Sequence, residues 1–116
     1  MRLIVAIIQP TRLNAVRDAL AQAGVTRLTV ADALGYARQK GQTAPFRGHE
    51  YQANLLRKIA LEIVVNEDFV ERTLETLTRA AWSGPHGAIG DGKIFVLPLV
   101  EAIDISTGER GQGAVN

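Results

Sequence analysis

Hydrophobic residues at regular spacing divide the first third of the chain into a strand, a helix and a second strand. Residues 3–8 are apolar without interruption, as in a strand covered on both faces or lying at a subunit contact, and Pro10 ends the run. Thr11 is placed to cap a helix that Gly24 ends. Its apolar residues recur every three or four positions, at Leu13, Val16, Leu20 and Ala23. Residues 27–36, rich in β-branched and apolar side chains, predict a second strand.

The clearest strand is residues 58–65, where the sequence KIALEIVV alternates between two faces. Ile59 and Ile63 lie on one face, and Ala60 and Val64 lie on the other. Because the second face is also partly apolar, we expect other copies of the chain to cover it in a closed homo-oligomer.

A second helix and a short C-terminal region follow this strand. Asn66 is placed to cap the helix, and the Gly-Pro pair at residues 84–85 ends it. Its apolar stripe consists of Val70, Leu74, Leu77 and Ala81. Residues 94–97 predict a fourth strand, in which Pro98 marks an end, an edge or a bulge. We expect a short fifth strand at residues 100–105 and then a mobile, glycine-rich tail.

The element order β-α-β-β-α-β is a twofold repeat. It fits the α+β ferredoxin-like sandwich, in which two helices cover one face of a four-stranded antiparallel sheet. A polar, glycine-interrupted loop, residues 37–55, separates the second and third strands, and a loop of this length in a compact domain is usually functional or disordered. We interpret it as functional. With 116 residues, the chain fits a single domain, 1–116, with no separate catalytic domain.

Composition excludes several classes of protein. Thirteen Lys and Arg against twelve Asp and Glu give a net charge of +1, so no bulk attraction to nucleic acid or membrane is expected. The absence of cysteine excludes a disulfide framework, a thiolate zinc site and a cysteine nucleophile. The apolar run at residues 3–8 is too short for a signal-peptide core or a membrane span. We therefore expect a cytoplasmic protein that is not inserted in a membrane.

The glycine-rich turn before the fourth strand is a candidate anion site. Residues 87–93, GAIGDGK, match the GxxxxGK part of a phosphate-binding P-loop. That interpretation fails because Ile94 stands where a P-loop needs Ser or Thr, and because the turn runs from a helix into a strand. Closely spaced glycines still let backbone N–H groups converge on an anion, and Lys93 adds a positive charge. The alternative is an ordinary turn with glycines for backbone geometry.

The long loop carries further candidates for anion binding. Gln39 and Lys58 stand near its two ends, and they approach each other if the second and third strands are neighbours. An amide and an ammonium so placed suit a small carboxylate or a phosphate. Other cations of this region are Arg38, Lys40, Arg47 and Arg57. The alternative is a solvated loop, the usual role of isolated charges.

The chain has two histidines, one on each glycine-rich segment. His49 and His86, with Glu50 or Asp91, are candidate metal ligands, although two such histidines are more often surface residues. Tyr51 is interpreted as an exposed loop aromatic. No Ser-His-Asp set or carboxylate pair stands out, so the sequence does not favour catalysis.

Motifs along nearly the whole chain resemble the PII nitrogen-regulatory signal-transduction proteins. The residues that carry the resemblance are AII at 6–8 with Pro10, VR at 16–17, AL at 19–20, TV at 29–30, Gly35, RQKG at 38–41, Thr43, RG at 47–48, EY at 50–51, Lys58, EIVV at 62–65, IGDGKIF at 89–95 and TGE at 107–109.

This resemblance implies a non-enzymatic homotrimer of ferredoxin-like subunits, in which three clefts between neighbours read the adenine nucleotide state. It implies that 2-oxoglutarate binds with MgATP at the base of the T-loop, residues 37–55. The T-loop then docks onto a membrane transporter, the ammonium channel being the best-known partner, or onto a regulatory enzyme. The glycine-rich B-loop is residues 83–92, and the C-terminal loop and tail are residues 104–116.

Family positions imply a role for individual residues. Adenine and ribose would be surrounded by Ile7, Thr29, Gly35, Glu62 and Val64. The phosphate side would comprise Arg38, Ile89, Gly90, Gly92 and Lys93. The effector site would comprise Gln39, Lys40, Gly41 and Lys58, with Gln39 helping to ligate Mg²⁺ and Lys58 pairing with an effector carboxylate. Arg47 and Tyr51 would serve partner contact or modification, since Tyr51 matches a tyrosine that is uridylylated in some members.

The sequence departs from the family pattern at three places, and the third changes the expected ligand. His49 replaces a small residue at the T-loop tip, and residues 85–88 replace a single residue. Asp104 and Ser106 replace two phosphate-binding arginines. Charge-assisted hydrogen bonds contribute about 1.5–3 kcal/mol each, so their loss predicts polyphosphate binding weaker by roughly 10²–10⁴-fold. We therefore expect ADP, AMP or another small ligand to be favoured over ATP.

An alternative interpretation is a metal-responsive trimer of the PII/CutA-like kind, linked to metal homeostasis through His49 and His86. The adenine-contacting positions favour the nucleotide-binding interpretation over this one.

Overall fold

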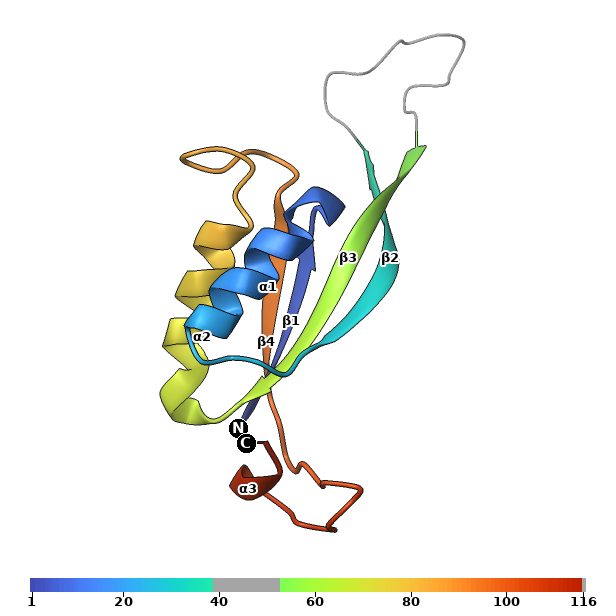
Figure 1. Ribbon diagram of the computed structural model, residues 1–116. Coiled ribbons are helices and arrows are strands. Elements are labelled where there is room, and N and C mark those ends of the chain that lie inside the picture. Colours follow the sequence, from blue (N-terminus) through green and yellow to red (C-terminus); the bar gives the residue numbers. More distant parts are fainter. Residues whose placement is uncertain (39–52, 116) are drawn as a thin grey trace, which may run out of the picture.

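The computed structural model describes residues 1–38 and 53–115 of the chain. In sequence order, its elements are β1 (Arg2–Ile8), a 3-10 turn (Pro10–Arg12), α1 (Leu13–Gln22), β2 (Thr29–Arg38), β3 (Ala53–Val65), α2 (Glu67–Ala80), β4 (Gly92–Pro98) and α3 (Gln112–Val115). The strand order is β2-β3-β1-β4, and every pairing is antiparallel. Helices α1 and α2 lie side by side on one face of the sheet (Figure 1). This is the predicted α+β ferredoxin-like fold.

The core lies between this face and the two helices, because alternate strand residues and one stripe of each helix point there. Its buried hydrophobic residues are Ile4, Ala6, Ile8, Val16, Leu20, Val25, Ile59, Leu61, Ile63, Val65, Val70 and Leu77. Thr73 is buried among them, and its hydroxyl donates to the Phe69 carbonyl at 2.7 Å. This buried hydroxyl is therefore satisfied within α2.

The opposite face of the sheet is partly apolar, and α1 and α2 leave it uncovered (Figure 1). Across β1 and β4, Val5 pairs with Phe95 and Leu3 pairs with Leu97. Leu3 also pairs with Val64 of β3. Cross-strand partners point to the same face, so these side chains lie together. Phe95 and Leu97 are 50% and 43% exposed, which makes this face a candidate interaction surface.

Strand β3 begins five residues earlier than predicted, and β2 is shifted by two residues toward the loop. Their pairing continues to Arg38 opposite Ala53, so both ends of the predicted loop 37–55 are strand. Backbone hydrogen bonds hold the ladder whatever the polarity of the side chains, so polar composition alone placed the loop boundaries too far apart. Residues 53–58 of β3, which precede Ile59, pair with β2 and not with β1. The two strands therefore project past the helices as an arm, residues 33–38 and 53–58 (Figure 1).

Two predictions of local structure near the first helix and second helix need correction. Thr11 lies inside the 3-10 turn, and the N-cap of α1 is Arg12. The turn forms because the Arg12 N–H donates to the Gln9 carbonyl at 2.9 Å. Asn66 is the N-cap residue of α2, as predicted, but its side chain makes no capping hydrogen bond. The acidic residues Glu67 and Asp68 in the first turn complement the helix dipole instead.

The predicted fifth strand at residues 100–105 is wrong. The chain reverses there, and the only bridge in this part of the described structure joins Ile103 to Arg110. The cause is the Asp104 carboxylate, which accepts hydrogen bonds from the Ser106 N–H at 2.8 Å and from the Ser106 hydroxyl at 2.6 Å. Such a side-chain-closed turn competes with an extended strand. Helix α3 follows in the segment predicted as a mobile tail, whose mobility stays a prediction. No helix among residues 1–38 and 53–115 is long and apolar enough to cross a membrane.

Candidate functional site

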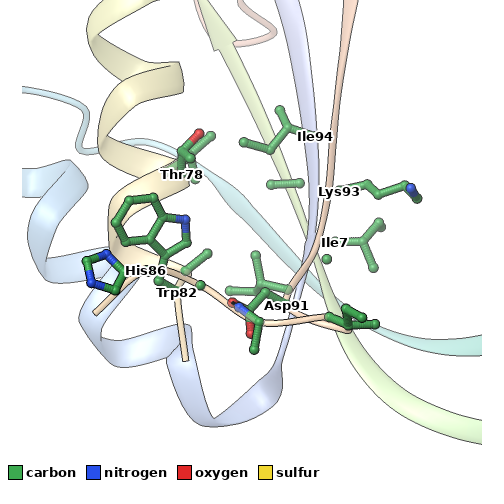
Figure 2. A pocket seen from close by; sticks show the side chains of 15 residues that line it. Ile7, Thr78, Trp82, His86, Asp91, Lys93 and Ile94 are labelled. Atoms are coloured by element: carbon green, nitrogen blue, oxygen red, sulfur yellow. Dashed lines mark hydrogen bonds between the residues drawn. The ribbon is translucent and has the colours of Figure 1, made fainter. Parts of the chain in front are cut away.

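A pocket of about 700 Å³ lies where the ends of α2 and β1 meet the start of β4. Cavities of this size hold small-molecule ligands in other proteins. Figure 2 shows Trp82 and His86 on one side of the pocket and Ile7 and Lys93 on the other. The glycine-rich loop, residues 83–92, forms its rim and carries Asp91. Apolar walls with a few charged groups at the rim suit a ligand that combines a flat apolar part with an anionic part.

The Asp91 carboxylate closes the glycine-rich loop on itself. One oxygen, Oδ2, accepts the backbone N–H of Ala88 at 2.7 Å and that of Ser83 at 3.1 Å. These hydrogen bonds, led by those from Ser83, hold the pKa of Asp91 below its usual range. Between the two donors, Gly87 lies against Trp82, and an added Cβ would be 3.0 Å from the indole ring. The inserted residues 85–88 are therefore anchored at both ends and packed in the middle.

Gly90 and Gly92 give the loop its backbone path. Both have positive φ, +94° and +127°, in the region that disfavours other residues. Gly92 pairs with Ile8, and a Cβ added to it would collide with the carbonyl oxygen of Ile7. This close approach brings Lys93 beside Ile7, its partner in the ladder.

The Gly90 carbonyl oxygen accepts two side-chain hydrogen bonds. Lys58 Nζ, at the base of the arm, donates at 2.9 Å, and Gln9 Nε2, just after β1, donates at 2.7 Å. Lys58 also lies next to Gly35, where an added Cβ would be 3.3 Å from the lysine Cγ. The structure thus brings four predicted site residues, Gly35, Lys58, Gly90 and Gly92, to one end of the sheet. Sequence reasoning missed Gln9, because its partner is 81 residues away.

A second hollow, of about 310 Å³, lies at the opposite end of the sheet. Its walls include Thr29, Glu62 and Val64, and Thr29 pairs directly with Glu62. Ala102, from the C-terminal loop, also lines it. In the same loop, hydrogen bonds from Ser106 and from the Thr107 N–H hold the pKa of Asp104 below its usual range.

The predicted nucleotide residues are therefore divided between two ends of one subunit. Gly92 begins β4 and the C-terminal loop follows its end, so the strand separates the glycine-rich loop from Asp104 and Ser106 (Figure 1). A strand of this length spans roughly 20 Å at about 3.3 Å per residue. Ile89, at the loop tip, is fully exposed. Arg38 is the last residue of β2. The remaining predicted residues lie outside the described residues, and these are Gln39, Lys40, Gly41, Arg47, His49 and Tyr51.

Within residues 1–38 and 53–115 there is no group of three His, Asp or Glu side chains that could hold a metal ion. His86 is exposed, and the nearby Asp91 carboxylate already accepts the loop N–H groups. A metal site using His49 with His86 stays a hypothesis, because His49 lies outside these residues.

Comparison with known proteins gives consistent matches over the full length. The family model described as "Nitrogen regulatory protein P-II" matches residues 1–109. The chain is 44% identical to the nitrogen regulatory protein P-II of Azospirillum brasilense, over 99% of this chain and 100% of that protein. It is 47% identical to the nitrogen regulatory protein GlnK1 of Methanosarcina mazei, over 99% of this chain and 97% of that protein.

A solved structure shows the same likeness in three dimensions. The crystal structure of Arabidopsis thaliana PII bound to citrate is similar with a TM-score of 0.77 and 36% sequence identity. The match covers 97% of this chain and 90% of that one.

The contact between Gly92 and Ile7 predicts a specific effect of adding one methyl group. We expect Gly92→Ala to destabilise the protein by at least about 1–2 kcal/mol, because alanine disfavours positive φ and its Cβ would meet the Ile7 carbonyl. Gly84→Ala is the matched control, since Gly84 has open space around its Cβ position and no positive φ. Urea unfolding at one protein concentration measures both. Equal midpoints for the two variants would contradict the prediction.

The lowered pKa of Asp91 predicts an acid-sensitive loop. An ionised carboxylate stabilises the folded loop above the ordinary carboxyl pKa of about 3.9, and this contribution is lost as pH falls through the lowered pKa. Trp82 is the only tryptophan and contacts the loop, so its fluorescence should change in that acid range. Asp91→Asn should lack the change, whereas Asp18→Asn, on exposed α1 surface, should keep it. Circular dichroism separates this step from global unfolding. An unchanged acid profile in Asp91→Asn would disprove the assignment.

Proposed function

The chain belongs to the nitrogen regulatory protein P-II family, and on this basis we propose that it is a signal-transduction regulator and not an enzyme. It forms a homotrimer in the cytoplasm and binds an adenine nucleotide in the clefts between subunits. The filled cleft changes the segment between β2 and β3, and a partner protein responds to that change. The partner is a membrane transporter, such as an ammonium channel, or a regulatory enzyme.

The proposal is supported by the location of the predicted nucleotide-binding residues at two opposite ends of one subunit. One end of the sheet has Ile7, Gly92 and Lys93, and the other end has Thr29 and Glu62. Each group lines its own incomplete hollow. A ligand that needs both groups must bind between the loop end of one subunit and the opposite end of a neighbour. The uncovered apolar face of the sheet supplies the surface for such an association.

The chemistry of the loop end favours an anionic ligand. Lys93 is exposed beside the glycine-rich turn, where backbone N–H groups and a positive charge suit a phosphate. Lys58, at the base of the arm, suits a carboxylate, and the similar Arabidopsis thaliana PII was crystallised bound to citrate. An effector such as 2-oxoglutarate, with Mg²⁺ and Gln39, would complete this part of the site.

The opposite end predicts which nucleotide is preferred. Asp104 and Ser106 supply no positive charge to a phosphate, and they are hydrogen-bonded to each other within their own turn. Arg27 lines this hollow, but a long polyphosphate still lacks the two cations that arginines at positions 104 and 106 would supply, and we propose that ADP or AMP binds at least as tightly as ATP. The metal-responsive alternative rests on His49 and His86, and no observation on the described residues favours it.

Isothermal titration with AMP, ADP and ATP tests the proposal. We expect saturable binding below millimolar concentration, with ATP no tighter than ADP. Lys93→Ala should weaken binding about tenfold or more, because it removes a charge-assisted hydrogen bond to phosphate. Arg79→Ala, on the exposed surface of α2, is the control. Absence of binding by all three nucleotides at millimolar concentration would refute the proposal.

A mixing experiment tests whether the site is shared between subunits. Lys93→Ala damages the loop end and Glu62→Ala damages the opposite end, so each variant alone should bind nucleotide weakly. When the two variants are unfolded together and refolded, every mixed trimer gains one cleft with both ends intact. We therefore expect tight binding to return at a fraction of the sites. No recovery, in samples whose mass confirms mixed trimers, would mean that one subunit supplies the whole site.

A further inference from the structure

Three elements meet at the carbonyl oxygen of Gly90. Lys58 Nζ reaches it from β3 at 2.9 Å, and Gln9 Nε2 reaches it from the end of β1 at 2.7 Å. Gly90 itself belongs to the glycine-rich loop, two residues before Gly92. One acceptor in the loop is therefore shared by two donors, one in β3 and one just after β1. These two donors connect the loop to the base of the arm and to the rest of the sheet.

The two donors respond differently to an anion. The Lys58 ammonium is charged, so a carboxylate or phosphate competes for it more strongly than a neutral carbonyl does. The Gln9 amide is neutral and has no comparable attraction to an anion. An anionic ligand that draws the Lys58 ammonium away from the loop removes one donor from Gly90 and leaves the other.

We propose that Gln9 is a positioning residue, which holds the Gly90 peptide when Lys58 turns to an anionic ligand. The proposal rests on the proposed function for the identity of that ligand. In the free protein both side chains hold Gly90 in place. With the ligand bound, Gln9 alone keeps the peptide in position. Gly92 and Lys93 follow directly, so release of Gly90 would displace the groups assigned to the phosphates.

Hydrogen exchange measured by mass spectrometry tests the first part without any ligand. Four proteins are compared: wild type, Gln9→Met, Lys58→Met and the double variant. Methionine keeps a side chain of similar length but donates no hydrogen bond. We expect each single variant to speed exchange in residues 83–93 by about two- to tenfold, and the double variant to speed it further. Gln22→Met, at the exposed end of α1, is the matched control.

The proposal would be overturned if Gln9→Met left the exchange rate of residues 83–93 unchanged in both the wild-type and the Lys58→Met background. If Gln9→Met lowers the melting temperature of the whole protein, Gln9→Glu repeats the test, because a carboxylate cannot donate to the Gly90 carbonyl.

The second part is tested with 2-oxoglutarate and MgADP or MgATP as probes. We expect Gln9→Met to weaken nucleotide binding about two- to tenfold more when 2-oxoglutarate is present than when it is absent. An equal loss of nucleotide affinity with and without 2-oxoglutarate would overturn the proposal that Gln9 takes over the Gly90 carbonyl when Lys58 leaves it. If the wild-type protein binds neither probe, the proposed function fails, whereas the exchange measurement still decides whether Gln9 holds the loop.

Discussion

The structure depends on one constraint: both faces of its sheet carry apolar side chains, and the helices of residues 1–38 and 53–115 cover only one of them. On the covered face, Ile4, Leu61 and Ile63 are completely buried. On the other face, Phe95 and Leu97 are about half exposed. Fully burying an exposed side chain of this kind contributes about 1.5–3 kcal/mol, so burying the exposed half of each against a neighbouring subunit in the proposed trimer is favourable. A sheet that is completed only by association also offers binding sites whose parts come from different subunits.

At each end of β4, an aspartate carboxylate closes the adjoining loop by accepting hydrogen bonds from it. At each end the chain must leave the edge of the sheet through an exposed, glycine-containing loop, and at each end an aspartate closes that loop. Asp91 accepts two backbone N–H groups before the strand, and Asp104 accepts backbone and hydroxyl donors after it. Carboxylates used in this way set the loop shape, so they are not free charges facing a ligand. The cations then decide the electrostatics of each hollow: Lys58 and Lys93 lie at the glycine-loop end, and Arg27 lines the hollow at the opposite end.

Periodicity predicted the strands, the two long helices and the sandwich, because those features depend on residues close in sequence. It failed where the structure is decided by distant residues or by a local side-chain hydrogen bond. The start of β3 is set by pairing with β2, and the turn at Asp104 is set by a side-chain hydrogen bond that hydropathy does not report. The contacts of Gly90 join residues 32 and 81 positions apart, so only the folded chain shows that Lys58 and Gln9 share an acceptor. Resemblance identified the family and assigned roles to residues, but the sequence carried no sign of Gln9.

The β2–β3 ladder connects the parts of the site that lie far apart. Thr29 and Glu62 are partners at one end of this ladder, and Ala33 and Lys58 are partners nearer the other. The pairing is uninterrupted from Thr29 opposite Glu62 to Arg38 opposite Ala53, so one ladder links the two ends of the site. In the proposed trimer, each subunit takes part in two clefts, one through its loop end and one through its opposite end. The arm that emerges from this ladder is therefore exposed to the state of both clefts. A partner that contacts the arm reads more than one binding event, which a site contained within a single subunit could not provide.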